Sequence, residues 1–147
     1  VAGFKYSYTG VDYSLAFQAL ARSLFPRRKF DVADARCLPY PDASFEIVAS
    51  GAVMMHVAEY EKVLAELVRV SRNYVLLHRT PVVSSGSTRF YEKKAYGVPC
   101  LEIHFGGSEL YNLFEKYRVG VIWEDEIFVD PNSGLSHRSY LLVKTYA

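Results

Sequence analysis

Two aspartates stand at the ends of short apolar runs, a position where α/β proteins commonly meet a ligand. The run Tyr8–Val11 ends at Asp12, and the run Phe30–Ala33 is followed by Asp34. Each run is long enough for one strand. A carboxylate at such a strand end can accept hydrogen bonds from the hydroxyl or amino groups of a nucleotide. The alternatives are local roles, with Asp12 as a helix-start carboxylate and Asp34 as a residue that closes its own turn.

A third strand end follows the next apolar run, Phe45–Ser50. Ser50 and Gly51 begin a turn of small residues, which lets backbone groups approach a ligand closely. His56 stands shortly before the next helix and could shape a substrate site, although a structural histidine bonded to backbone explains it equally well. The three strand ends together indicate a crevice at one edge of an open sheet.

Helices are predicted between these strands. Ser14 is a suitable N-cap for a helix over residues 15–24. The strongest helix covers residues 59–71, where apolar side chains recur every three or four positions, and a buried strand over residues 74–78 follows it. Alternation of strands and helices predicts a mainly parallel sheet with right-handed connections.

The second half of the chain is less regular. Residues 80–107 show no clear period and are interpreted as a lid or a substrate-side insertion. A helix is predicted over residues 109–117, followed by strands over residues 119–123 and 139–144. The turn cluster at residues 130–134 joins these strands, so the chain is expected to end in an antiparallel hairpin at a sheet edge.

Composition narrows the class of protein. A chain of 147 residues, half of them hydrophobic and 22% charged, predicts one globular domain over residues 1–147. A net charge of +1 does not indicate the basic surface typical of nucleic-acid binding. No apolar run approaches the ~20 residues of a membrane span. Cys37 and Cys100 are too few for a disulfide framework and favour a cytoplasmic protein. Cys100 and His104 alone do not make a zinc site, so no metal is predicted.

Several short motifs occur in a characteristic order between residues 30 and 70. They are Asp34-Ala35, Leu38-Pro39-Tyr40-Pro41-Asp42, Ser44-Phe45-Glu46, His56-Val57 and Glu66-Leu67-Val68-Arg69-Val70. This order resembles that of class I S-adenosylmethionine-dependent methyltransferases, in the branch that modifies small molecules. Upstream, residues 9–14 resemble the second strand of that family and its acidic end. The resemblance is good over residues 8–80 and holds in outline beyond them.

The resemblance implies both a fold and an activity. The fold is an open, mostly parallel, Rossmann-like α/β sheet flanked by helices, with an antiparallel strand at the C-terminal end. The activity is transfer of a methyl group from S-adenosylmethionine to a small-molecule acceptor, which depends mainly on alignment of the reactants.

The resemblance also implies roles for particular residues. Asp12 would hold the cofactor ribose, Asp34 and Ala35 the adenine, and the turn at Ser50 and Gly51 the methionine part. The full set of implied cofactor-binding positions is Asp12, Tyr13, Asp34, Ala35, Ser50 and Gly51, with His56 weakly on the substrate side. Many relatives carry Asn and Glu where this chain has Ala52 and Met55, so no catalytic residue is identified.

The first strand of the family and its Gly-rich loop would precede Tyr8, where only seven residues stand. Without that strand the sheet would have an unpaired central gap. Three arrangements are compatible with such a gap: a fragment of a longer protein, a second copy that fills the gap, and a sheet that has closed into a non-catalytic relic. We expect the N-terminally truncated fragment, assembled as a homodimer.

Two other functions remain open. The first is a truncated binding or scaffolding domain that has the fold but no cofactor. The second is a nicotinamide dehydrogenase, because Asp12 would suit the ribose of NAD equally well. Asp34-Ala35 and the loop at residues 38–42 argue against the dehydrogenase.

Overall fold

The computed structural model describes residues 6–95 and 97–145. Its contacts divide the chain into two compact units, residues 1–39 and residues 40–147. Each unit has its own β-sheet. Within the described residues, no helix has both the length and the apolar character needed to cross a membrane.

The first unit contains one strand–helix–strand motif. Strands β1 (Thr9–Asp12) and β2 (Lys29–Val32) pair in parallel, and helix α1 (Leu15–Leu24) connects them. The Ser14 hydroxyl accepts a hydrogen bond from the Phe17 amide at 3.3 Å, which satisfies one amide at the helix start. The predicted strand, N-cap and helix are therefore confirmed.

The apolar side chains of α1 are exposed. Leu15, Leu20 and Leu24 keep 73%, 53% and 62% of their surface in contact with solvent. None of the helix residues is buried, although Phe17, Leu20 and Leu24 recur at the three- and four-residue spacing of one side of a helix. The first unit therefore has an amphipathic helix without a core beneath it.

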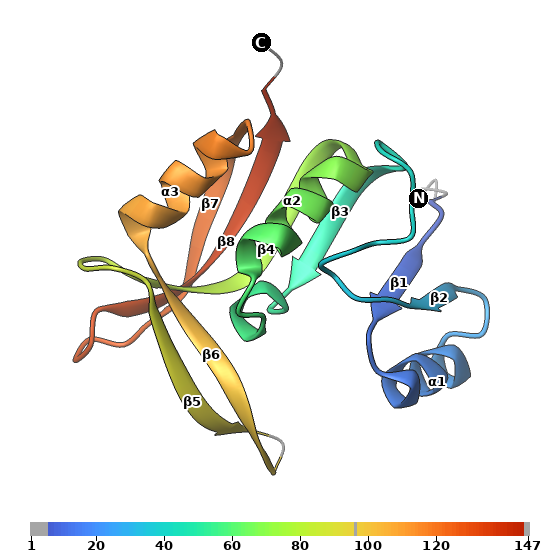
Figure 1. Ribbon diagram of the computed structural model, residues 1–147, viewed down its shortest axis with the longest axis horizontal. Helices are drawn as coiled ribbons and strands as arrows, with labels where there is room; N and C mark the ends of the chain where they lie inside the picture. The colour runs from blue at the N-terminus through green and yellow to red at the C-terminus, as the bar shows by residue number, and fades with distance from the viewer. Residues whose placement is uncertain (1–5, 96, 146–147) are drawn as a thin grey trace, which may run out of the picture. The chain divides into compact units, whose positions relative to one another are not determined.

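The second unit is built on a six-stranded mixed sheet (Figure 1). Its strands are β3 (Phe45–Gly51), β4 (Ser71–Val83), β5 (Arg89–Ala95), β6 (Val98–Gly106), β7 (Val119–Val129) and β8 (Leu135–Lys144). The order is β5-β6-β4-β8-β7, and β3 also pairs with β4. Strand β4 is parallel to β3 and β6, whereas β8 lies antiparallel between β4 and β7. The predicted antiparallel C-terminal hairpin is confirmed.

Helices α2 (Tyr60–Val70) and α3 (Gly107–Lys116) cover the same face of this sheet (Figure 1). A short 3₁₀ helix, η1 (Met54–His56), precedes α2. Helix α2 buries Val63, Leu64, Leu67 and Val70, and α3 buries Leu110, Leu113 and Phe114. Phe114 meets the fully buried Tyr140 of β8 edge to face, with ring centroids 5.5 Å apart. Each such side chain stabilises the fold by about 1.5–3 kcal/mol on burial, so the core of the protein lies here.

The strands of the second half are longer than the sequence predicts. Strand β4 extends through Pro81 to Val83, and residues 80–107, which show no clear period, contain the hairpin β5–β6. Proline lacks an amide hydrogen and is normally a sign against a central strand. Pairing with β8 overrides that local preference, because Pro81 lies opposite His137.

The two sheets are not joined by strand pairing within the described residues. Strand β1 pairs with β2, and β3 pairs with β4, but no pairing connects the two sets.

Candidate functional site

Asp12 lies at the carboxyl end of β1, as predicted. Its Oδ1 atom accepts a hydrogen bond from the Ser14 amide at 2.8 Å. This contact is the helix-start role that was the alternative to ligand binding. Because a carboxylate has two oxygens with about four acceptor positions, one local contact leaves capacity for a ligand hydroxyl.

Asp34 follows β2 and binds its neighbour Arg36. The Arg36 guanidinium donates to both carboxylate oxygens at 2.7–3.1 Å, and the Arg36 amide donates to Oδ1 at 2.8 Å. Hydrogen bonds from the Arg36 side chain and amide lower the pKa of Asp34 to about 2. Asp34 is therefore ionised at neutral pH and also closes its own turn, which was the alternative role for this residue.

The parallel pairing of β1 and β2 brings both aspartates to one edge of the small sheet. Asp12 lies opposite Val32, and the Ala33 amide donates to the Asp12 carbonyl at 3.1 Å. Asp34 is the next residue along the chain. Tyr13, also predicted at this edge, is 82% exposed.

The predicted small-residue turn lies at the carboxyl end of β3 in the second unit. Ser50 is 6% exposed, whereas a Cβ atom built on Gly51 would meet no atom within 4 Å. Ala52 has a positive φ of 60°, and its amide donates to the His78 carbonyl at 2.9 Å. A left-handed non-glycine residue costs conformational energy, so the tight turn is held by its surroundings.

His56 connects this turn to the hairpin β5–β6. Its Nδ1–H donates to the Leu101 carbonyl at 2.6 Å. The side chain is exposed, and its observed partner is backbone, as the structural interpretation of His56 expected. The contact fixes the position of η1 on β6.

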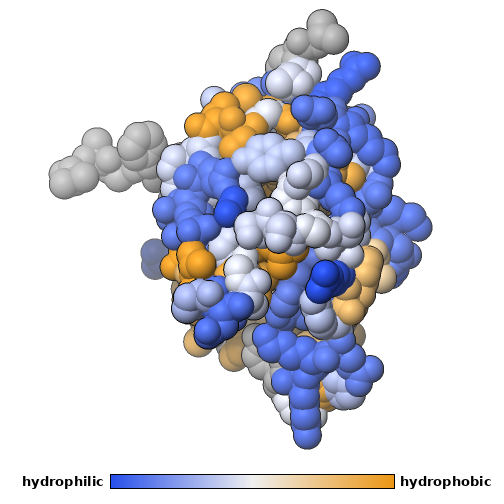
Figure 2. Space-filling model, turned by 90° about the vertical axis from the view of Figure 1, so that its left-hand side faces the viewer, coloured by the Kyte–Doolittle hydropathy of each residue, from blue (hydrophilic) through white to orange (hydrophobic). Residues whose placement is uncertain are grey.

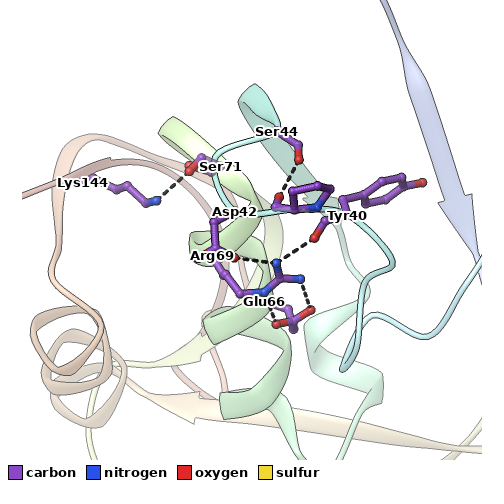
Figure 3. Close-up of polar contacts among 8 residues, drawn as sticks. Tyr40, Asp42, Ser44, Glu66, Arg69, Ser71 and Lys144 are labelled. Carbon is purple, nitrogen blue, oxygen red and sulfur yellow. Dashed lines mark hydrogen bonds and ion pairs between the residues drawn. The ribbon is translucent and has the colours of Figure 1, made fainter.

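Arg69 explains why the Tyr40-Pro41-Asp42 and Glu66-to-Arg69 motifs occur together (Figure 3). Its guanidinium binds the Glu66 carboxylate at 2.6 and 2.8 Å and donates to the Tyr40 carbonyl at 2.7 Å. It also contacts the Asp42 carboxylate at 2.8 Å. Helix α2 therefore holds the loop that leads into the start of β3.

A polar cluster on β6 was not predicted from the sequence. Glu102 and His104 alternate with the apolar residues Leu101, Ile103 and Phe105, and Glu102 is 6% exposed. The two-residue alternation was the available signal, because it places both polar side chains on one side of a strand. Among the described residues, no group of three or more His, Cys, Asp or Glu side chains is arranged to hold a metal ion.

Two surface pockets lie elsewhere in the second unit. One, of about 300 Å³, is lined by Tyr60, Phe105 and Lys116 among others, between α2 and α3. The other, of about 500 Å³, lies at the start of α3 beside Arg138. Neither of these pockets is lined by Ser50 or Gly51.

A family model described as a methyltransferase domain matches residues 1–77, which is more than half of the chain. The chain belongs to this methyltransferase domain family. The match includes all three predicted strand ends and confirms the resemblance seen in the sequence. The motifs of residues 9–70 are therefore those of a methyltransferase domain.

Curated relatives support the same family. The chain is 42% identical over 53 residues to ajmaline N-methyltransferase of Rauvolfia serpentina, covering 36% of this chain and 18% of that protein. It is 38% identical over 65 residues to demethylmenaquinone methyltransferase of Thermus thermophilus, covering 42% of this chain and 30% of that protein. The matched segments thus span less than a third of either relative.

Solved structures confirm the fold over nearly the whole chain. A SAM-dependent methyltransferase from Methanosarcina mazei matches with a TM-score of 0.75 at 16% identity, covering 97% of this chain and 84% of that one. The 1,6-didemethyltoxoflavin-N1-methyltransferase of Burkholderia thailandensis matches with a TM-score of 0.69 at 21% identity, covering 94% and 61%. The predicted Rossmann-like methyltransferase fold is therefore confirmed.

Proposed function

We propose that this chain binds S-adenosylmethionine and transfers its methyl group to a small-molecule acceptor. The observation that carries the proposal is the pair of acidic strand ends, Asp12 and Asp34, on one edge of a parallel strand pair in a methyltransferase domain. The relatives named for ajmaline, norajmaline and demethylmenaquinone methylation support a small organic acceptor.

The described residues fit the adenosine part of this cofactor. Asp12 keeps acceptor capacity beyond its bond to the Ser14 amide, which suits a ribose hydroxyl. The carboxylate of Asp34 and the amide of Ala35 suit the amino group and a ring nitrogen of adenine. The open space at Gly51 allows backbone to approach the remainder of the ligand.

The cofactor, when bound, supplies a methyl group on a positively charged sulfur. The contribution of the chain is to bind and align the reactants, which needs no covalent intermediate. The turn at Ser50 and Gly51 is suited to this role because Ser50 is buried and the contact between His56 and Leu101 fixes the following segment. Cytoplasmic action is part of the proposal and is supported by the free thiols of Cys37 and Cys100.

A non-catalytic domain that acts in binding or scaffolding, without the cofactor, is the second candidate. It is favoured by the contact of Arg36 with both oxygens of Asp34, because a bound adenine must share or displace that contact. The Asp34 and Arg36 side chains are 47% and 40% exposed, and ion pairs of such exposure are weak and exchangeable. The Asp34–Arg36 pair is therefore compatible with both candidates, because a ligand can displace it and the turn is closed without one.

NMR mapping tests the proposal. S-Adenosylhomocysteine is titrated into the ¹⁵N-labelled chain, and saturable shifts are expected at the amides of Asp12, Ala35 and Gly51, with none at Asp130 in the turn between β7 and β8. Formation of S-adenosylhomocysteine from S-adenosylmethionine with secondary-amine and quinol acceptors then measures transfer. Binding without turnover on any acceptor would contradict methyl transfer by this chain. No shifts at millimolar ligand would contradict cofactor binding and would support the non-catalytic candidate, which has the fold but no cofactor.

A further inference from the structure

The hairpin β5–β6 carries a buried carboxylate beside an imidazole. On β6, Glu102 and His104 lie on the side of the strand opposite to Ile103 and Phe105, which are buried in the core. Glu102 is itself only 6% exposed. Carboxylates are rarely buried to this extent unless they are paired. Figure 2, by contrast, shows mostly hydrophilic residues over the projecting end of the hairpin.

Both oxygens of Glu102 are engaged. His104 Nε2 lies 2.9 Å from Oε1, and the Lys93 ammonium donates to Oε2 at 2.7 Å. Burial raises the pKa of Glu102, but the hydrogen bonds and charges of Lys93 and His104 outweigh it, so that the pKa lies below its ordinary value. The carboxylate is therefore ionised at neutral pH.

The ionised carboxylate sets the tautomer of the imidazole. Because an ionised carboxylate only accepts hydrogen bonds, His104 Nε2 must carry the proton that it donates. In the neutral ring, Nδ1 then holds the lone pair. The Tyr91 ring, whose centroid is 4.5 Å from that of His104, also restricts the orientation of the imidazole. A base held by an orienting carboxylate is the usual arrangement of a general base in an enzyme.

The pair lies beyond the carboxyl end of β3, where the methyl donor is proposed to bind. Strand β4 lies beside Gly51 at His78 and continues to Val83, where it pairs with β6. The His56 contact to Leu101 connects the Gly51 turn to the residue that precedes Glu102. The elements that present the strand end therefore also hold the hairpin with the pair.

A neighbouring histidine has an unsatisfied buried atom. Nδ1 of His137 on β8 is buried and has no hydrogen-bond partner among the described residues. Burial lowers the pKa of His137, and Glu102, His104 and Lys93 are close enough to act on it electrostatically. Unsatisfied buried polar atoms are uncommon in native proteins. A polar atom of a bound molecule would satisfy this one.

We propose that Glu102 and His104 form a proton-accepting pair for a methyl acceptor that carries a hydroxyl or N–H group. This inference rests on the proposed function. The O–H or N–H bond of the acceptor breaks, its electron pair stays on oxygen or nitrogen, and the proton passes to His104 Nδ1. His104 is the catalytic residue, and Glu102 is a positioning residue that stabilises the imidazolium until the proton leaves to water. Lys93 keeps Glu102 ionised, so the proton remains on the imidazole.

An acidic phenol tests the pair without knowledge of the natural acceptor. 4-Nitrophenol is titrated into the purified chain, with and without S-adenosylhomocysteine, at a pH at which the free phenol is protonated. A saturable phenolate absorbance band is expected in the wild type, lost in His104→Gln and weakened in Glu102→Gln. Glu92→Gln removes an exposed carboxylate from the same hairpin and should keep the full band.

A measurement on the wild type tests the proposal even if the variants fail to fold. Long-range ¹H–¹⁵N NMR of histidine-labelled protein is expected to place the His104 proton on Nε2. A proton on Nδ1, a phenolate band that persists in His104→Gln, or no saturable band in the wild type would each overturn the proposal.

Calorimetry with S-adenosylhomocysteine on the same preparation separates the two proposals. Cofactor binding without a phenolate band rejects the pair and leaves the proposed function intact. A phenolate band without cofactor binding rejects methyl transfer and leaves a proton-accepting pair.

Discussion

The first unit presents Asp12 at the end of one four-residue strand and Asp34 just after another, beside a helix that buries none of its side chains. The second unit presents Ser50 and Gly51 on β3, which pairs with a thirteen-residue strand that has partners on both edges. Helices α2 and α3 bury seven side chains on that sheet. The residues of the methyltransferase family pattern therefore lie partly on short strands without a packed core and partly on a sheet with one.

Because of this difference, we expect the residues that determine ligand binding to differ from those that determine stability. The candidate adenosine-binding carboxylates are held by local contacts, namely Ser14 to Asp12 and Arg36 to Asp34. The Gly51 turn is held by a packed sheet and by the contact between His56 and Leu101. Changes in the second unit should therefore affect folding, whereas changes at the strand ends should affect binding.

The largest expected effect is on the core of the second unit. Phe114→Ala removes a side chain that is 1% exposed and should lower the free energy of unfolding by about 3–5 kcal/mol. Leu20→Ala, on the 53% exposed face of α1, should cost less than about 1 kcal/mol. Urea denaturation measures both. An equal cost for Leu20→Ala would mean that the face of α1 is covered, and the contrast between the units would fail.

A smaller loss of stability is expected at Arg69. Arg69→Ala leaves the Glu66 carboxylate and the Tyr40 carbonyl without this partner and should lower the urea midpoint. Arg69→Lys should recover part of the loss, because lysine keeps the charge but not the planar fork of donors. Lys62→Ala, which removes an exposed ion pair at 3.7 Å, is the matched control and should have little effect. A midpoint unchanged in Arg69→Ala would show that the loop is held by other contacts.

Substitution of Gly51 is expected to change ligand affinity without changing stability. A Cβ atom would meet no protein atom within 4 Å, so Gly51→Ala should change the free energy of unfolding by less than about 0.5 kcal/mol. The added methyl group would occupy space left for the ligand and should weaken S-adenosylhomocysteine binding in calorimetry. Gly120→Ala, whose Cβ would lie 3.5 Å from Thr145, is the control and should leave affinity unchanged. Unchanged affinity in Gly51→Ala would remove this turn from the binding site.

The smallest effect concerns Tyr111 of α3. A hydrogen bond to Glu124, together with burial, raises the pKa of Tyr111 to about 12 from an ordinary value of 10. The folded state thus favours the neutral phenol, and this contribution to stability is complete below pH 10 and lost as the pH rises through about 12. Tyrosinate absorbance, taken as the difference between wild type and Tyr111→Phe, should show this late ionisation. Glu124→Gln should lower the pKa of Tyr111, and an unchanged value would exclude Glu124 as its cause.

Sequence patterns predicted the parts of the fold that local physics determines. The strand that ends at Asp12, the Ser14 cap and helix α2 follow from apolar periodicity and capping chemistry. The full length of β4 did not follow, because Pro81 and the polar residues around it are unfavourable in a strand until β8 pairs with them. Long-range pairing is not encoded in any short window.

The candidate site was predictable to a similar degree. Family motifs located Asp12 and Asp34, and the turn-closing contact of Asp34 followed from the ordinary behaviour of aspartate in loops. The pair of Glu102 and His104 was missed because its function depends on a third residue, Lys93, on the neighbouring strand. An alternating pattern shows which face a residue occupies, but it does not show which residues it meets there.

The most direct test is calorimetric titration of the 147-residue chain with S-adenosylhomocysteine, with its mass in solution measured alongside. Our account predicts saturable binding that is lost in Asp12→Ala and in Asp34→Ala, and that persists in Asp31→Ala, which removes a neighbouring carboxylate on β2. No binding at millimolar ligand by the folded chain would contradict the account, as would binding that both Asp12→Ala and Asp34→Ala retain.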